Sequence, residues 1–261
     1  MNVGASTSCF YPLETEKALE RVINLGFSQC EVFFNTISEL KEPFVKELKT
    51  MADGSGVQVL SVHPFSSSLE NNCIFGEYQR RYDDFIDVYK MHCHAAAMLG
   101  AKVVVIHGAA AKAKRPLPPE HYFDRFASLI EIGKQEGVTV CQENVNLFRS
   151  QSIDFCKQMR DYLGDDFRMV FDIKQSLRAG YQPFEFIDEF KHQIAHIHLS
   201  DNSDTVDCLP PGRGTFDFNR LFRTLDGAGY QGGYVIEIYS KGCDVDRELA
   251  ASKKFLEEFT K

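Results

Sequence analysis

Four residues with metal-binding side chains stand at or near the ends of short apolar segments in the second half of the sequence. They are Glu143, Asp172, His198 and Glu237. The segments that carry them are short and rich in Val, Ile and Phe, which is typical of β-strands. Three carboxylates and one imidazole form a ligand set suited to Mn²⁺, Mg²⁺, Co²⁺ or Zn²⁺. Because no cysteine belongs to the set, a closed structural zinc site is not expected.

The alternation of side chains along a strand predicts that these four groups point toward one another. Glu237 shares a face of its strand with Val235, whereas Ile236 and Ile238 share the opposite face and would pack on surrounding helices. The same parity applies to the other three residues. Carboxylates gathered in a partly desolvated site would repel one another, and their pKa values would rise. We therefore expect one divalent metal ion as the cofactor.

Four further residues are candidates for binding substrate oxygen atoms: His63, His107, Lys174 and Arg213. The two histidines each follow a predicted strand, and Gly108 leaves space beside His107. Lys174 shares a face with Asp172, two residues earlier. A single histidine at a strand end is more often a hydrogen-bonded structural residue than a ligand, so His63 is the weakest of the four candidates.

The elements that position these residues form a regular alternation. Strands are predicted at residues 3–6, 30–34, 57–62, 102–106, 138–142, 169–171, 194–199 and 234–238. Amphipathic helices are predicted at residues 14–25, 44–51, 77–99, 119–136, 152–162, 183–190, 218–225 and 246–259. Eight such units indicate a parallel sheet closed as a single (β/α)8 TIM barrel over residues 1–261, with an open doubly wound sheet as the structural alternative. In this barrel the active site lies at the carboxyl ends of the strands.

Composition and charge limit the classes of partner and the cellular location that we expect for the protein. The 261 residues carry a formal net charge of -8, which does not favour a nucleic-acid binder. The eight cysteines are scattered and include no CxxC pair, so free thiols in a reducing compartment are expected. No secretory signal and no apolar run long enough to span a membrane are visible. We expect a cytoplasmic protein. The composition leaves the oligomeric state open, a homo-oligomer included.

Several motifs together resemble the xylose isomerase-like barrel superfamily, in particular its sugar phosphate isomerase/epimerase family. The resemblance covers nearly the whole chain. Its carriers are Gln142-Glu143-Asn144, Phe171-Asp172-Ile173-Lys174-Gln175, His196-Ile197-His198-Leu199-Ser200-Asp201, Pro211-Gly212-Arg213-Gly214-Thr215-Phe216-Asp217 and the segment 230–237. The resemblance implies that Glu143, Asp172, His198 and Glu237 bind the metal, and that Glu143 and Glu237 also serve as catalytic acid and base.

The chain departs from two branches of the superfamily at particular positions. Ketose 3-epimerases usually carry His three residues after the metal-binding Asp and Arg six residues after the metal-binding His. Here these positions hold Gln175 and Asp204. Endonuclease IV has an Asp-x-His motif shortly after the equivalent of His198, and residues 203–209 contain no His. His63 and His107 nevertheless resemble two of the zinc ligands of that enzyme.

The sequence thus predicts a metal-dependent isomerase or epimerase that acts on a sugar or sugar phosphate by proton transfer through an enediolate. One alternative is a dehydratase, a lyase of a polyhydroxylated carbonyl compound on the same metal scaffold. A second is an endonuclease IV-like DNA-repair enzyme, and a third is a barrel without catalytic activity. The expected partner is a small carbohydrate, with no nucleic acid and no membrane.

Overall fold

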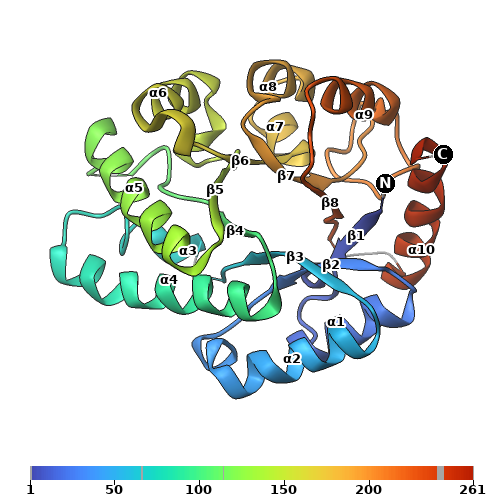
Figure 1. The fold of residues 1–261 in the computed structure, drawn as a ribbon. Coiled ribbons are helices and arrows are strands. Elements are labelled where there is room, and N and C mark those ends of the chain that lie inside the picture. Colours follow the sequence, from blue (N-terminus) through green and yellow to red (C-terminus); the bar gives the residue numbers. More distant parts are fainter. Residues whose placement is uncertain (1, 66, 114, 240–243, 261) are drawn as a thin grey trace.

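The computed structural model describes residues 2–65, 67–113, 115–239 and 244–260. Its strands are parallel and close into a barrel in sequence order (Figure 1). They are β1 (Val3–Ser6), β2 (Gln29–Phe33), β3 (Gln58–His63), β4 (Val103–Ile106), β5 (Thr139–Glu143), β6 (Met169–Asp172), β7 (Ile194–Leu199) and β8 (Gly233–Ile236). Because β1 pairs with β8, the predicted (β/α)8 barrel is confirmed and the open sheet is excluded.

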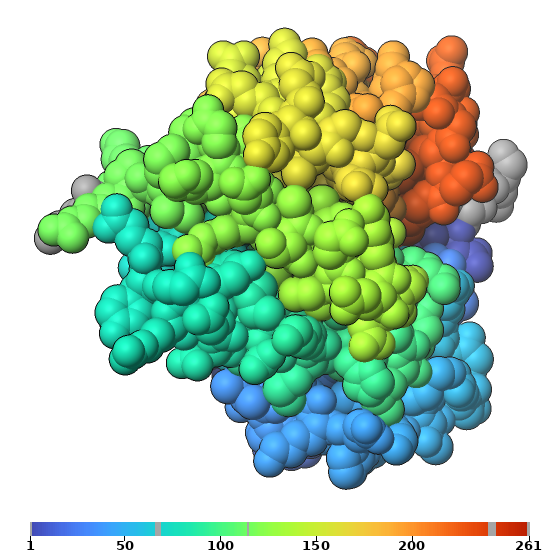
Figure 2. Space-filling view, turned by 60° about the vertical axis from the view of Figure 1, so that its left-hand side comes forward, coloured from blue at the N-terminus to red at the C-terminus, as the bar shows by residue number. Residues whose placement is uncertain are grey.

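Helices surround the barrel as an outer layer (Figure 1). They are α1 (Thr15–Asn24), α2 (Glu42–Gly54), α3 (Ser67–Glu70), α4 (Gln79–Leu99), α5 (Pro119–Glu136), α6 (Ile153–Leu163), α7 (Ile173–Arg178), α8 (Pro183–Phe190), α9 (Phe218–Gly227) and α10 (Val245–Leu256). Short 3-10 helices are η1 (Thr7–Phe10), η2 (Ile37–Leu40), η3 (Arg149–Gln151), η4 (Gly164–Asp166) and η5 (Glu257–Thr260). Figure 2 shows one side of this layer, where α2, α4, α5 and α6 follow one another from blue to yellow.

The helices end where the sequence changes its backbone preference. Helices α4 and α5 stop at Gly100 and Gly137, which adopt φ values of 80° and 70°. Glycine accepts this left-handed conformation without the steric cost that a side chain would add. The sequence did not predict α7, whose six residues are too few to show helical periodicity, nor the short α3.

Two apolar layers hold the barrel. The larger layer fills the space between strands and helices, where Val32, Phe171 and Ile236 are fully buried. The smaller one lies inside the barrel and consists of Val103, Val105, Cys141 and Val170. Polar side chains occupy the barrel interior toward the carboxyl ends of the strands, so the smaller apolar layer lies beneath them.

The cysteines and the apolar character of the helices can also be described. The seven cysteines within the described ranges are free thiols, while Cys243 lies outside those ranges. Within the same ranges, no helix combines the length and the apolar character that a membrane crossing requires.

Candidate metal centre

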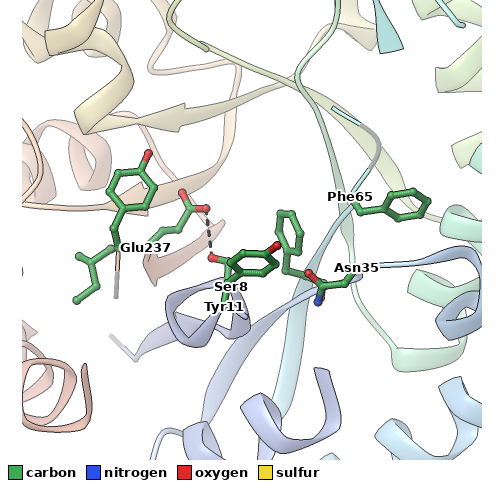
Figure 3. Close-up of a pocket in the computed structure, with 8 residues that line it drawn as sticks. Ser8, Tyr11, Asn35, Phe65 and Glu237 are labelled. Atoms are coloured by element: carbon green, nitrogen blue, oxygen red, sulfur yellow. Dashed lines mark hydrogen bonds between the residues drawn. The ribbon is translucent and has the colours of Figure 1, made fainter. Parts of the chain in front are cut away.

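A cavity of about 420 Å³ opens at the carboxyl ends of the strands. Figure 3 shows residues that line it, with Tyr11 and Phe65 on its walls and Glu237 facing Ser8. The complete lining is Ser8, Tyr11, Phe33, Asn35, Phe65, Glu237, Ile238 and Tyr239. The cavity therefore combines aromatic walls with a few polar groups, as small-molecule sites commonly do.

The four predicted ligands converge beside this cavity. Nδ1 of His198 lies 3.1 Å from Glu143 Oε1, 3.3 Å from Glu237 Oε2 and 3.7 Å from Asp172 Oδ2. The side chains of His198 and Asp172 are fully buried, whereas that of Glu237 keeps 15% of its surface exposed. The potential ligand atoms of all four residues lie within 4.8 Å of one another. The four residues that the alternation of side chains selected thus lie close together in the structure.

Asp172 is fixed from two directions. It ends β6 and caps α7, because its Oδ1 accepts a hydrogen bond of 3.1 Å from the backbone N–H of Gln175. The amide side chain of Asn144 bonds both the N–H and the C=O of Asp172, at 2.7 Å and 3.0 Å. The carboxylate is consequently held with its Oδ2 toward His198 before any ligand binds.

Lys174, in the first turn of α7, lies inside the cluster. Its ammonium group contacts Asp172 Oδ2 and lies 2.5 Å from Glu237 Oε2, and its side chain is 2% exposed. Although burial opposes the charged form, Asp172 and Glu237 raise the pKa of Lys174 well above its usual value. Lys174 is therefore a buried cation paired with Asp172 and Glu237, and it does not belong to the lining of the cavity.

The carboxylates of the cluster differ in the direction of their pKa shifts. Burial raises the pKa of Asp172, and the neighbouring Glu143 and Glu237 add to this effect against the opposing Lys174. Burial also acts against the ionised form of Glu237, but the positive charges of Lys174 and His198 keep its pKa below the usual value. The charged form is therefore favoured at Glu237 and disfavoured at Asp172, where a divalent cation would offset the cost of burial.

His63 and His107 meet on the other side of Glu143. Nε2 of His107 lies 2.7 Å from Glu143 Oε2 and 3.0 Å from His63 Nε2. His63, His107 and Glu143 form a second group whose ligand atoms are close enough to hold a metal ion. The structure does not place these histidines on the lining of the cavity described above.

Gly108 has a different role from the one that the sequence indicated. Its φ is 89°, and a Cβ atom there would lie 2.1 Å from the hydroxyl oxygen of Tyr122. The backbone N–H of Gly108 donates to the buried carboxylate of Glu70. The space beside Gly108 is therefore filled by Tyr122, and the glycine is required by the turn that follows His107.

Arg213 is the one predicted site residue that faces elsewhere. Its Nε lies 2.8 Å from Glu248 Oε2 on α10, and its side chain is about half exposed. Asp201 holds the loop that carries it by accepting hydrogen bonds from the backbone N–H groups of residues 202, 212, 214 and 216. The structure thus separates Arg213 from the cluster around His198.

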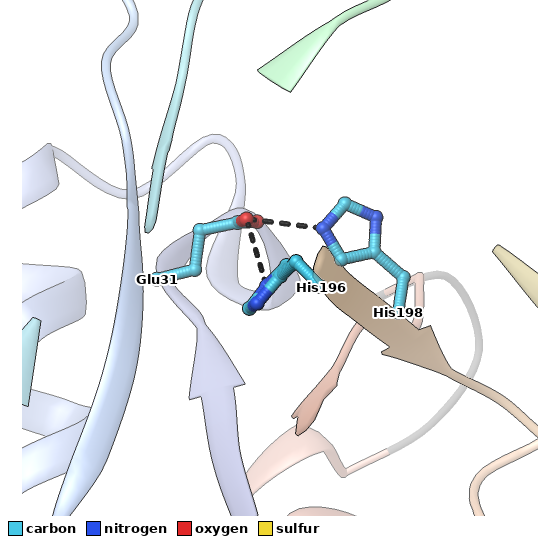
Figure 4. Close-up of side chains that lie close together, drawn as sticks. All are labelled: Glu31, His196 and His198. Carbon is cyan, nitrogen blue, oxygen red and sulfur yellow. Dashed lines mark hydrogen bonds and ion pairs between the residues drawn. The ribbon is translucent and has the colours of Figure 1, made fainter. Parts of the chain in front are cut away.

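One buried carboxylate was overlooked in the sequence. Glu31 lies on β2, is fully buried, and its Oε2 is 3.0 Å from His198 Nε2 (Figure 4). It also forms a group of possible metal ligands with His196 and His198. The available signal was a carboxylate in the middle of an apolar strand, between Cys30 and Val32, where an unpaired charge would be costly.

The residues of the first cluster fit a divalent metal ion. They offer three carboxylates and one imidazole nitrogen, which is a common oxygen and nitrogen donor set. Glu143 Oε2 is buried and makes no hydrogen bond of acceptable geometry to any described residue, despite the nearby His107. A buried oxygen in that state has coordination capacity to spare.

Comparison with known proteins finds a similar enzyme and several solved structures of similar fold. An inosose dehydratase of Erwinia tasmaniensis is 25% identical over 229 residues, which cover 73% of this chain and 72% of the relative. The solved structure of 3-keto-D-glucoside 4-epimerase, YcjR, from E. coli has a TM-score of 0.79 at 19% identity, with 99% of each chain covered. The IOLI protein, solved with a zinc atom, has a TM-score of 0.74 at 15% identity and covers 100% of this chain and 96% of its own.

These solved structures share the fold, and a family model covers most of the sequence. The model described as xylose isomerase-like TIM barrel matches residues 19–259. The sequence resemblance is thereby confirmed. The chain belongs to the xylose isomerase-like TIM barrel family.

Proposed function

We propose that the protein is a metal-dependent isomerase or epimerase of a sugar or sugar phosphate. The observation that carries the proposal is the convergence of Glu143, Asp172 and Glu237 on Nδ1 of His198, beside a cavity large enough for a small ligand. Aromatic walls and scattered polar groups suit a sugar, whose C–H faces are apolar and whose rim carries hydroxyl groups. The epimerase named among the solved structures acts on a substrate of this kind.

Glu143, Asp172, His198 and Glu237 would hold one divalent ion, Mn²⁺, Mg²⁺, Co²⁺ or Zn²⁺. The bound ion would act as a Lewis acid toward a substrate carbonyl. The zinc atom in the IOLI structure supports a metal in this family. The hydrogen bonds from Asn144 and Gln175 keep Asp172 oriented for this role.

Glu237 is the better placed of the two glutamates to remove a proton. It lines the cavity, Lys174 and His198 hold its pKa below the usual value, and Ser8 lies 3.4 Å from its Oε1. Proton removal from the carbon next to a carbonyl leaves an enediolate, and a general acid must then return a proton. Glu143 would return it, because it lies beside Nδ1 of His198 and contacts His107, which is 17% exposed.

A dehydratase is the second candidate, and the similarity to an inosose dehydratase favours it. Its first step would be the same proton removal by Glu237. A hydroxyl group on the next carbon would then leave, and a protonated group would have to assist its departure. His107 is the candidate for that assistance, since its ring is partly exposed beside Glu143.

The experiment that tests the proposal uses D₂O. The purified protein, loaded in turn with each of the four metals, is incubated with ketoses, ketose phosphates, 3-keto-glucosides and inososes, and the products are followed by NMR. Deuterium incorporation next to the carbonyl, lost on chelation and in Asp172→Asn, is the expected result. New C=C or deoxy signals would instead establish the dehydratase. If no compound exchanges with any metal, the proposal fails.

A further inference from the structure

We propose that Glu31 is a positioning residue, which holds the imidazole of His198 so that Nδ1 faces the three carboxylates of the metal centre. The inference rests on the proposed metal-dependent function. It assigns a role to a residue that lies outside the four-residue cluster, and it concerns orientation and not proton transfer.

The two ring nitrogens of His198 face different partners. Nε2 lies 3.0 Å from Glu31 Oε2, while Nδ1 lies 3.1 Å from Glu143 Oε1 (Figure 4 shows the Glu31 side). An ionised carboxylate can only accept hydrogen bonds, so Nε2 donates to Glu31, and Nδ1 can likewise donate to Glu143 until a metal ion replaces its proton. A ring that keeps its proton on Nε2 has its lone pair on Nδ1 when a metal ion binds there.

Glu31 is itself held in place. The Ser6 hydroxyl donates to its Oε1 at 2.9 Å, and the Ser61 hydroxyl donates to its Oε2 at 2.7 Å. The side chain has no exposed surface. Three strands thus fix one carboxylate, because Ser6 ends β1, Glu31 lies on β2 and Ser61 lies on β3. A carboxylate so constrained can orient an imidazole without moving when the ligand arrives.

An irregularity in the sheet brings these partners together. The pairing of β2 with β3 runs from Cys30 with Val59 directly to Glu31 with Ser61, so one residue of β3 is passed over. Such bulges re-aim side chains next to functional sites. Without the shift, Leu60 would stand opposite Glu31, and the Ser61 hydroxyl would lie one position further along the strand.

The same contacts argue against Glu31 as a metal ligand. Glu31, His196 and His198 have ligand atoms close enough for an ion. Yet Glu31 Oε2 already accepts from Ser61 and from His198 Nε2, and the Ser61 hydroxyl also lies 3.1 Å from His196 Nε2. A metal ion there would break the hydrogen bonds of Glu31 with Ser61 and His198, whereas Glu143 has a buried oxygen without a hydrogen bond to any described residue.

Calorimetric titration of the metal-free protein with Zn²⁺ and Mn²⁺ tests the role. Removal of an outer partner of a ligating histidine typically weakens metal affinity by roughly 10–100-fold, which is the loss expected for Glu31→Ala. Glu31→Gln keeps an acceptor oxygen and should lose less. Asp201→Asn is the matched control, since Asp201 is also buried and its carboxylate accepts from backbone N–H groups instead of a cluster side chain, as far as the described residues show. The control should bind as the wild type does.

NMR of ¹⁵N-histidine-labelled protein gives a second readout. The Nε2–H proton of His198, assigned by its absence in His198→Ala, should be protected from exchange and should shift in Glu31→Gln. This signal can be recorded without metal, so it tests the contact even if Glu31→Ala fails to fold. Unchanged affinity in a folded Glu31→Ala, or an unchanged signal in Glu31→Gln, would overturn the inference. Loss of a whole bound ion in Glu31→Gln would make Glu31 a ligand and overturn it too.

The two proposals fail in different ways. Wild-type protein that binds no divalent ion would refute the metal-dependent function, while the NMR signal would still report on the pairing of Glu31 with His198. Wild-type protein that binds one ion and loses it in Asp172→Asn, but not in Glu31→Ala, would leave the function standing and remove the positioning role.

Discussion

The ammonium group of Lys174 lies 2.5 Å from Glu237 Oε2, so the carboxylate that opens onto the cavity already has a positively charged partner inside the protein. The same ammonium contacts Asp172. Two of the four proposed metal ligands are therefore held by an internal cation, which a divalent ion must tolerate or displace.

We predict that Lys174→Met strengthens metal binding. The substitution keeps a long apolar stem but removes a positive charge that repels the incoming ion. An increase in affinity of about tenfold corresponds to about 1.4 kcal/mol. Calorimetry with Mn²⁺ measures it, and Lys134→Met on the outer surface is the control, since Lys134 pairs with Glu131 and Asp166. Weaker binding in Lys174→Met would show instead that the lysine arranges the carboxylates for the metal.

Glu143→Gln and Glu237→Gln should each lower turnover by roughly 10²–10⁴-fold, the contribution typical of a general acid or base. Metal content must be measured for each variant, because both glutamates are also proposed ligands. Deuterium exchange separates the two roles. A variant with full metal occupancy that still exchanges at the wild-type rate has lost no base, and the assignment of that glutamate would be wrong.

The buried ring of His92 predicts a loss of stability in acid. Burial lowers its pKa from 6.5 to about 3, and neither ring nitrogen has a hydrogen-bond partner among the described residues. Between these two pH values only the unfolded chain takes up the proton, so unfolding becomes easier as the pH falls. From pH 8 to pH 5 this effect amounts to about 2 kcal/mol.

His92→Phe should remove that part of the pH dependence. The ring packs among Phe34, Phe65 and Tyr89, which suit an apolar replacement. Urea unfolding at pH 8 and pH 5 measures the difference in free energy of unfolding. His192→Gln, at an exposed position, should behave as the wild type. An equal drop in wild type and His92→Phe would contradict the prediction.

The protein should not incise abasic DNA. Its formal net charge is -8, and residues 203–209 lack the histidine that completes the zinc ligands of endonuclease IV. Incubation of zinc-loaded protein with a duplex that contains an abasic site, next to endonuclease IV as a positive control, decides the matter. Efficient incision would favour the DNA-repair alternative, for which His63, His107 and Glu143 would supply a second metal group.

Much of the barrel could be predicted from the sequence because strand and helix periodicities are local. The parity that set Glu237 apart from Ile236 and Ile238 also predicted the inward cluster, whose close approach the structure shows. Lys174 and Arg213 were harder to place. A lysine that follows a strand can face a loop or turn back into the barrel, and only the helical start of α7 decides which. Arg213 found a partner on α10, which is distant in the sequence.

The sequence marked Glu31 only as a carboxylate within an apolar strand, and its role could not be predicted because its partners come from three other strands. The positioning role proposed for Glu31 depends on Ser6, Ser61 and His198, none of which is near it in the sequence. The shift in register that sets Ser61 beside it is a property of the closed sheet. A period of two along a single strand carries no information about such a shift.

Most of the cavity lining and most of the metal ligands come from different parts of the barrel, although Glu237, Ile238 and Tyr239 of the lining follow β8. Ser8, Tyr11, Phe33, Asn35 and Phe65 belong to the first three strands or the segments after them, whereas three of the four ligands end or lie in β5, β6 and β7. Glu237 alone belongs to both sets. In evolutionary terms, mutations in the first third of the gene can alter which molecule is accepted while the reactive groups stay intact. A library randomised at Tyr11, Phe33, Asn35 and Phe65, with Ser8 kept as the partner of Glu237, is therefore a starting point for changing substrate range.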